Sequence, residues 1–211
     1  MKARCVLYLI VILGVVSITH GQLVRSYGIK LGAVSASQTW HYTYTSDLTT
    51  GYRWGVTGGV YVELLDIPLL SFIAEIQYTQ KGMTVTVPVT TESQPNGTGP
   101  FTTMSSRVDY LSVPLLAKLR LKSPLFTPYL IAGPRVDLLV SKRGDGFEAV
   151  VDKFESTDFG GTVGLGVELH TLFPVGLLAE FRYNSSFKDV FNNNLLTVRN
   201  HSFDFLLGMR L

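Results

Sequence analysis

The chain has 211 residues, with 18 Lys or Arg and 16 Asp or Glu, so its formal net charge at pH 7 is +2. This length is typical of one domain. So small a net charge gives no electrostatic reason to expect nucleic acid as a partner.

The N-terminal segment is typical of an export signal. Two basic residues precede an apolar run at 6–16 that is too short to span a bilayer comfortably. Small residues before Gln22 suit a signal peptidase, so we expect a signal peptide at 1–21 and one mature domain at 22–211. A permanent N-terminal anchor is the alternative. The only cysteine precedes the apolar run and would leave with the signal, so the mature domain would have no disulfide.

Beyond the signal, apolar and polar residues alternate with a period of two, as in strands with two unlike faces. The alternation occupies eight segments in chain order: 27–40, 52–64, 71–81, 110–121, 128–140, 159–169, 175–184 and 201–211. Their lengths suit transmembrane β-strands, which need roughly 9–11 residues, and exceed the 5–6 residues or so that are common in soluble proteins. Helical periodicity is not convincing anywhere after the signal.

The connections between these segments alternate between short and long. Short connections follow the second, fourth and sixth segments (65–70, 122–127 and 170–174), and long ones follow the others (41–51, 82–109, 141–158 and 185–200). Outer-membrane barrels show this alternation, with tight periplasmic turns and larger outer loops. We therefore predict an all-β fold, an eight-stranded antiparallel up-and-down transmembrane β-barrel. It would lie in the bacterial outer membrane, with both termini in the periplasm.

The two faces of each segment differ in chemistry. In the fourth segment, Leu111, Leu115 and Leu119 share one face, while Lys118 and Arg120 share the other. A basic side chain that faces lipid at the bilayer midplane costs about 2–4 kcal/mol. The apolar faces must therefore meet lipid, and the ionic faces must line the lumen.

The ionic faces together define a lumen charge network of six bases and six acids. Its members are Lys30, Glu63, Glu75, Lys118, Arg120, Arg135, Asp137, Glu168, Glu180, Arg182, Asp204 and Arg210. The interior of an eight-stranded barrel is only wide enough for side chains. We therefore predict that these residues form a salt-bridged plug, and we expect no catalytic residue, metal or cofactor.

Aromatic residues near the predicted strand ends suggest two interfacial girdles. The outer girdle would contain Trp40, Tyr42, Tyr44, Tyr52 and Trp54, and the periplasmic girdle Phe72, Phe126, Tyr129 and Phe173. Pro114 and Pro134 fall within predicted strands, where each removes a hydrogen-bond donor from the ladder. We expect a local bulge at each proline.

Four motifs carry a resemblance to a known family. They are YLSVPLLAK at 110–118, PYLIAGP at 128–134, DFGGTVGLGVE at 158–168 and LAEFRY at 178–183. Together they resemble the PorT-like family of small outer-membrane barrels of Bacteroidetes-type bacteria, whose pattern includes the strand prolines. The resemblance implies an integral barrel, and a few family members are linked to secretion and gliding machinery. One departure is the final residue, Leu211, where such barrels commonly have an aromatic.

Three functions fit this pattern. The leading one is a structural or interaction barrel, a monomer in outer-membrane lipid that meets surface or secretion-machinery proteins through its long outer loops. The second is a narrow porin-like channel. The third is a soluble lipocalin-like barrel, which would bind an apolar ligand inside and would need the two faces reversed. Catalysis is not favoured, because His201 and Ser202 are adjacent in a strand and would point to opposite faces.

Overall fold

The computed structural model describes residues 24–44, 48–65, 67, 69–88, 101–121, 126–144, 151–169, 175–192 and 195–211. The predicted signal peptide at 1–21 lies outside these residues. The described elements are β1 (Val24–Tyr42), β2 (Gly51–Leu64), β3 (Leu70–Pro88), β4 (Phe101–Arg120), β5 (Phe126–Gly144), β6 (Thr157–Leu169), β7 (Gly176–Ser186), β8 (Phe191–Asn192) and β9 (Leu196–Arg210).

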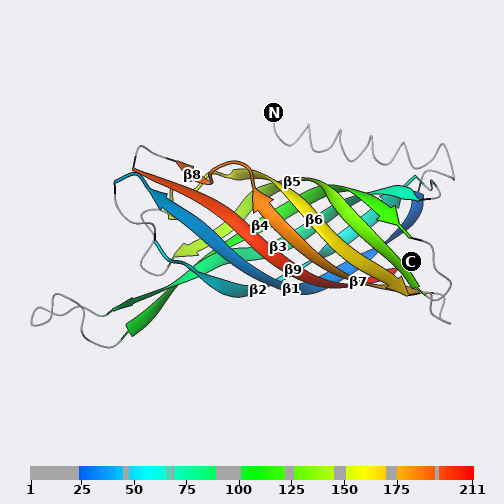
Figure 1. Cartoon of the computed structure of the whole chain (residues 1–211), viewed down its shortest axis with the longest axis horizontal. Coiled ribbons are helices and arrows are strands. Elements are labelled where there is room, and N and C mark those ends of the chain that lie inside the picture. The colour runs from blue at the N-terminus through cyan, green and yellow to red at the C-terminus, as the bar shows by residue number, and fades with distance from the viewer. Residues whose placement is uncertain are drawn as a thin grey trace, which may run out of the picture.

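Eight long strands close into a barrel (Figure 1). Their order is β1-β2-β3-β4-β5-β6-β7-β9, and β9 pairs back with β1. Every pairing is antiparallel, and the two-residue β8 pairs with the outer part of β9. The predicted eight-stranded, antiparallel, up-and-down barrel is confirmed. Among the described residues, no helix is long and apolar enough to cross a membrane.

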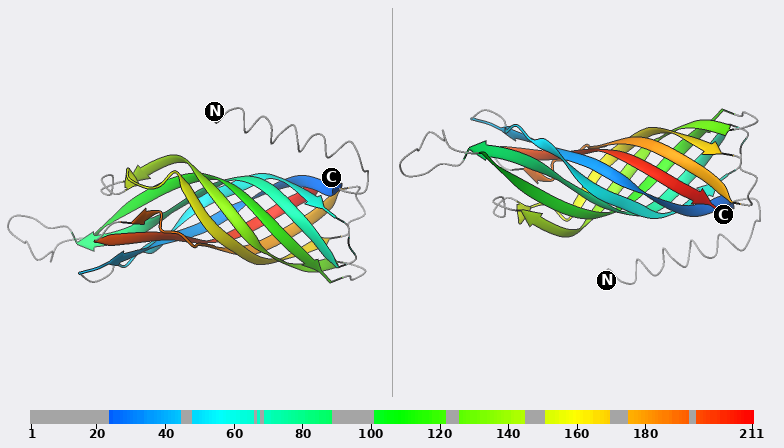
Figure 2. Two further views of the ribbon diagram at one scale, coloured as in Figure 1. Left: turned by 90° about the horizontal axis from the view of Figure 1, so that it is seen from above. Right: turned by 90° about the horizontal axis from the view of Figure 1, so that it is seen from below.

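The start of β1 and the end of β9 lie at the same end of the barrel (Figure 2). The backbone amide of Leu211 donates to the carbonyl of Tyr27 there, at 2.8 Å. Strands β2, β4 and β6 end, and β3, β5 and β7 begin, at this end too. We call it the inner end, and the opposite end, with the longer connections, the outer end.

The two faces of the barrel wall differ in chemistry as predicted, over most of its length. Leu115, Leu165 and Leu207 point outward and expose 56%, 56% and 71% of their surface. Lys118 and Arg182 lie on the opposite phase of their strands and expose 2% and 1%. A soluble lipocalin-like barrel would need apolar residues inside and ionic residues outside, so this alternative is excluded.

The strands continue further at the outer end than the sequence predicted. β3 and β4 remain paired as far as Pro88 and Phe101, so much of the predicted loop at 82–109 is strand (Figure 1). That prediction was wrong because the apolar phase turns inward in this part. Met83 and Val85 are buried, whereas the threonines that alternate with them are more exposed.

The two strand prolines interrupt the ladder without changing the register. Pro114 pairs with Arg135, and the β4–β5 register is the same before and after the prolines. The β5–β6 ladder also runs past Pro134 without a shift. The β4–β5 register shifts instead at Asp109 and Tyr110, close to the outer end. The prediction of a bulge at each proline is therefore wrong. The barrel accommodates the missing donors because a few neighbouring residues of the ladder are not paired.

Candidate functional site in the barrel interior

The structure brings the predicted lumen charge network together inside the barrel. Eleven of its twelve members are buried, and Arg210 lies at the inner rim with 28% of its side chain exposed. Two further ionic residues, Lys81 and Asp158, are buried with them. The predicted network omitted both, although Lys81 lies on the polar phase of the predicted strand at 71–81; Asp158 falls in the predicted loop at 141–158.

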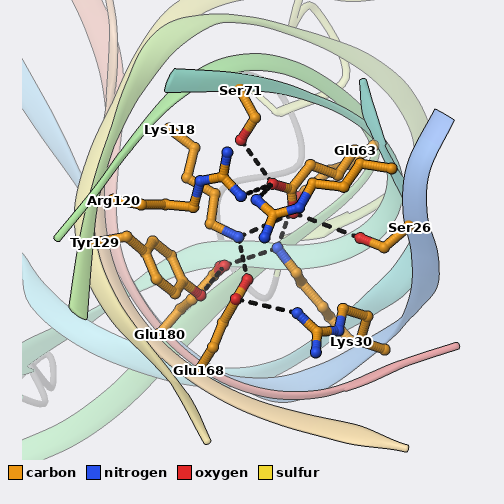
Figure 3. Close-up of polar contacts among 12 residues, drawn as sticks. Ser26, Lys30, Glu63, Ser71, Lys118, Arg120, Tyr129, Glu168 and Glu180 are labelled. Atoms are coloured by element: carbon orange, nitrogen blue, oxygen red, sulfur yellow. Dashed lines mark hydrogen bonds and ion pairs between the residues drawn. The ribbon is translucent and has the colours of Figure 1, made fainter. Parts of the chain in front are cut away.

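The first ionic layer, at the inner end, is centred on Glu63 (Figure 3). Its carboxylate accepts hydrogen bonds from Lys118 at 2.9 Å, from Ser71 at 2.6 Å and from Arg25 at 2.8 Å. Arg120 Nη1 lies 3.7 Å from the same carboxylate. Strands β1, β2, β3 and β4 thus meet across the lumen at one acid.

Lys118 joins Glu63 to a second acid, Glu168 on β6. Glu168 also accepts from Arg210 Nη1 on β9, at 3.2 Å. The first layer therefore crosses the whole width of the barrel, as Figure 3 shows for Glu63, Lys118 and Glu168.

The second ionic layer pairs two acids with two bases. Arg182 donates to Glu75 through both terminal nitrogens, at 2.8 Å each, and also bonds Glu180. Lys30 Nζ lies 2.6 Å from Glu75 and 2.8 Å from Glu180. Tyr129 donates its hydroxyl to Glu180 at 2.6 Å. Burial of these charges costs desolvation, which such dense pairing offsets.

The third ionic layer lies nearer the outer end. Asp137 is 2.5 Å from Lys81 Nζ and 3.0 Å from Arg135 Nε. Asp158 stands directly across from Asp137 in the β5–β6 ladder, an arrangement that is unfavourable for two like charges. Neutral donors moderate it, because Ser186 and the side-chain amide of Asn200 both bond to Asp158 Oδ2.

Asp204 lies between the second and third layers. It stands opposite Arg182 in the β7–β9 ladder and accepts a hydrogen bond from Ser202 at 3.0 Å. Asn184 in turn donates to the hydroxyl of Ser202 at 3.1 Å. Neutral polar side chains therefore connect this acid to the surrounding network.

Each buried lysine lies over a tyrosine ring. The distance from Nζ to the ring centroid is 4.5 Å for Lys30 over Tyr61, 5.2 Å for Lys81 over Tyr110 and 4.4 Å for Lys118 over Tyr129. A desolvated cation–π contact of this kind contributes roughly 2 kcal/mol.

The sequence analysis missed these tyrosines. It placed Tyr129 in the periplasmic girdle, which is wrong: the residue is 2% exposed and faces the lumen. Strand phase could have found all three, because each tyrosine lies an even number of residues from a buried charge on its own strand.

Above the third layer the interior is mainly apolar, with a few buried polar side chains such as Gln38 and Ser106. We call the apolar cluster the outer core: Trp40, Met83, Val85, Val108, Tyr110, Val151, Phe154, Val190, Phe191, Leu196 and Val198. Four of its members, Val151, Phe154, Val190 and Phe191, come from the connections on either side of β6 and β7. These two connections therefore fold back across the outer mouth.

The outer core corrects two further assignments. Trp40 is 1% exposed and donates its indole N–H to Gln38 at 3.2 Å, and Tyr42 packs against the same core. Neither belongs to the predicted outer girdle, because both lie on the inward phase of β1. Tyr52 and Trp54 do face outward, with 49% and 64% of their surface exposed. Phe173 lies outside the described residues.

The sequence analysis expected His201 and Ser202 of the last strand to point to opposite faces, and the structure shows where each side chain lies. His201 lies on the outer surface, with its ring centroid 5.7 Å from that of Tyr52. Ser202 faces the lumen and is 0% exposed. The two side chains are on opposite sides of the barrel wall. Among the described residues, no three or more His, Cys, Asp or Glu side chains are grouped so as to hold a metal ion.

Comparison with known proteins gives one family match. The family model described as "Outer membrane protein beta-barrel domain" matches residues 23–192. No curated protein matches the chain.

Several solved structures are similar at low sequence identity. OprG from Pseudomonas aeruginosa is 10% identical, with a TM-score of 0.48, over 90% of this chain and 98% of that one. The attachment invasion locus protein Ail of Yersinia pestis is 11% identical, with a TM-score of 0.42, over 88% and 98%. The outer membrane protease OmpT from Escherichia coli is 10% identical, with a TM-score of 0.46, over 92% and 98%. These similarities are too distant to carry an argument about function.

Proposed function

The chain belongs to the outer membrane protein beta-barrel family, and from this premise we propose that it is a sealed barrel that acts through its outer end. In this proposal the protein is a monomer in outer-membrane lipid, catalyses no reaction and binds no nucleic acid. Its partners are surface or secretion-machinery proteins. The motifs at 110–118 and 158–168 support a place in the PorT-like branch, in which a few members have such partners.

One observation carries the sealed-barrel proposal: two different barriers stand in series in the lumen. The ionic layers fill the interior with paired side chains, such as Arg182 held by Glu75 and Glu180. The outer core fills the mouth above them with apolar side chains. A solute would have to break buried ion pairs and also open a dry apolar cluster, and each step is costly.

The orientation in the membrane follows from the two ends of the barrel. The inner end has short connections and both ends of the described chain, which favours the periplasm. Polar groups lie on the outward phase near the outer end: the partly exposed Arg107 pairs with the buried Asp109 at 2.8 Å and donates to the hydroxyl of Tyr78 at 3.1 Å. Such groups suit the water-facing side of the outer leaflet. A cleaved signal peptide at 1–21 is consistent with export to this location.

Single-channel recording in planar bilayers tests the proposal against the porin-like alternative. We expect the wild-type barrel to give no steady conductance. Steady, reproducible wild-type openings would overturn the sealed-barrel proposal and favour a channel.

Variants that remove one barrier at a time make the recording informative. Glu75→Ala with Arg182→Ala empties part of the second layer, and Trp40→Ala with Phe154→Ala empties part of the outer core. If the barriers act in series, neither pair alone opens a pore, whereas the four substitutions together do. A pore that opens in either pair alone would show that the other barrier does not seal the lumen.

A further inference from the structure

The outer ends of β3 and β4 stand apart from the rest of the barrel (Figures 1 and 2). The β2–β3 ladder ends at the pair Gly51–Thr84, and the β4–β5 ladder ends at Ser106–Gly144. The β3–β4 ladder continues to Pro88–Phe101. Residues 85–88 and 101–105 therefore form a two-stranded outer ribbon, and neither edge has a partner strand among the described residues.

The described residues closest in sequence to the neighbouring strand ends pack away from the outer ribbon. Before β2, Leu48 forms a bridge with Trp40, and Thr50 donates to the carbonyl of Gln38 at 2.6 Å. This stretch thus follows β1 and leaves the β3 side. After β5, Val151 is buried in the outer core. Leu48, Thr50 and Val151 therefore pack at the barrel mouth and not against the outer ribbon.

Hydrogen bonds at the inner end of β4 show which backbone groups face the free edge. The amide of Arg120 donates toward β3, to Leu69, and the amide of Leu121 donates toward β5, to Pro128. Antiparallel strands alternate these directions residue by residue, and the β3–β4 register is constant along the whole ladder. Odd-numbered residues of β4 therefore direct their N–H and C=O groups toward the β5 side. In the outer ribbon these residues are Phe101, Thr103 and Ser105.

The β4 edge lacks the features that natural proteins use to block strand pairing. Such features are charged side chains, proline and strongly bulged or covered edges. Residues 101–106 contain neither a charge nor a proline, and Phe101 is 71% exposed. The β3 edge ends in Pro88, and the rim elsewhere carries Lys142, Lys188 and Arg199.

We propose that the β5-side edge of β4, Phe101–Ser105, which no described strand pairs with, binds an extended segment of another protein by strand addition. The inference rests on the proposed function, because it names the element through which the outer end acts. Backbone hydrogen bonds would supply affinity in this mode, and alternate side chains would supply specificity. On the outward face of the ribbon, Thr103 lies opposite Thr86, with 3.3 Å between their hydroxyl oxygens. This face therefore suits β-branched and small polar residues of an uncharged partner segment.

A second copy of this chain fits the edge less well. Two copies in one membrane share an orientation, so a two-fold axis between them must run along the membrane normal. That axis leaves two β4 edges running nearly parallel. Parallel pairing is less stable per residue than antiparallel pairing. A segment of a different protein can approach antiparallel from the medium.

Amide hydrogen exchange tests the proposal directly. The probe is a nonapeptide of alternating threonine and valine with a lysine at each end, added to the barrel in lipid nanodiscs. Strand addition should slow exchange at Phe101, Thr103 and Ser105 by at least about tenfold and leave Thr102 and Met104 unchanged, because their amides already face β3. Slowing without this alternate pattern, or no slowing, would overturn the proposal.

Two matched variants distinguish a loss of probe binding from a folding defect. Thr103→Pro removes a donor from the free edge and none from the β3–β4 ladder, so probe binding should weaken at least about tenfold. Thr103→Val keeps the donor and should bind as the wild type does. If both variants bound the probe equally and had the circular dichroism spectrum of the wild type, the proposal that this edge binds the probe would be refuted. Conductance measured on the same preparations separately decides the sealed-barrel proposal.

Discussion

Along β3, Glu75 and Met83 both point into the barrel, yet their surroundings differ completely. Glu75 is held by Lys30 and Arg182, whereas Met83 packs in the outer core. The outward residues of the same strand differ in the opposite sense: Ile76 exposes 52% of an apolar surface, and Thr86 is an exposed polar residue. One strand therefore carries two reversed chemical patterns in a single, unbroken alternation.

The difference shows that strand geometry fixes which residues face inward, while the surrounding medium fixes their chemistry. Where lipid lies outside, enclosing the ionic groups is favoured, because each one that faces hydrocarbon costs free energy. Where water lies outside, an apolar interior is favourable, as in a soluble barrel. Arg107, Asp109 and Tyr78 form a hydrogen-bonded set on the outward phase of β3 and β4, which marks the level at which the medium changes.

Disruption of the ionic layers should have the largest effect on the free energy of unfolding. Glu75→Ala removes the carboxylate between Lys30 and Arg182 and leaves both bases without one of their acids. Removal of one partner from a buried charge pair costs about 3–5 kcal/mol, because an uncompensated charge remains. Urea unfolding in lipid vesicles should show this loss in the free energy of unfolding of the whole barrel.

The neighbouring residue supplies the control for that substitution. Ile76 faces lipid one position further along β3, and Ile76→Leu should change the free energy of unfolding by less than about 1.5 kcal/mol. If the two variants were equally stable, the ionic layers would contribute nothing to the fold beyond filling space.

A substitution in the outer core should have a smaller and more local effect. Phe154 is 5% exposed, and Phe154→Ala should cost about 3 kcal/mol, the lower end for loss of a buried phenylalanine. Because the side chain comes from a connection, we expect the loss to fall on local opening of the mouth. Amide exchange at Val190 and Val198 should then quicken about 100-fold, while urea unfolding of the ionic part is unchanged. Equal loss in both measurements would mean that the two parts unfold as one unit.

The part of the barrel in lipid could be predicted from the sequence because one chemical rule holds throughout it. Alternation in a run such as Leu111–Leu121 shows both the strand and the face that meets lipid. The outer part was not predicted as strand because the apolar residues face inward there, although the alternation of the strand continues. Thr84, Val85, Thr86 and Val87 still alternate, but their apolar phase points inward, and we interpreted the stretch as loop.

The pairing within the interior network was harder to predict from the sequence than the strands were. Lys30 and Glu180 could be assigned to the lumen from phase alone, but their pairing depends on the stagger of eight strands around the ring, which one sequence does not encode locally. Trp40 and Tyr129 were misplaced for a related reason. Aromatics near strand ends suit a girdle and an interior equally well, and only the strand phase separates the two.

Insertion of the same charge on the outer surface at two heights would locate the change of medium. Leu115→Arg places a base in the lipid-facing belt and should lower the free energy of unfolding by about 2 kcal/mol, since depth and snorkelling reduce the midplane cost. Thr86→Arg lies on the outward phase of the outer ribbon and should change it by less than about 0.5 kcal/mol. Equal costs at the two sites would place both in one medium and refute the division of the barrel into two parts.

The smallest effect is expected where the same kind of ion pair lies in water. Lys188 and Glu155 bond at the outer end with 49% and 48% of their side chains exposed, whereas Lys30 and Glu75 expose 1% and 0%. Lys188→Ala should cost at most about 1 kcal/mol, and raising the salt concentration to 1 M should abolish that cost by screening. The cost of Lys30→Ala should persist at 1 M salt, because the buried pair has no access to ions. A salt-sensitive Lys30→Ala effect would mean that water and ions reach the second layer, so the ionic part would not be sealed.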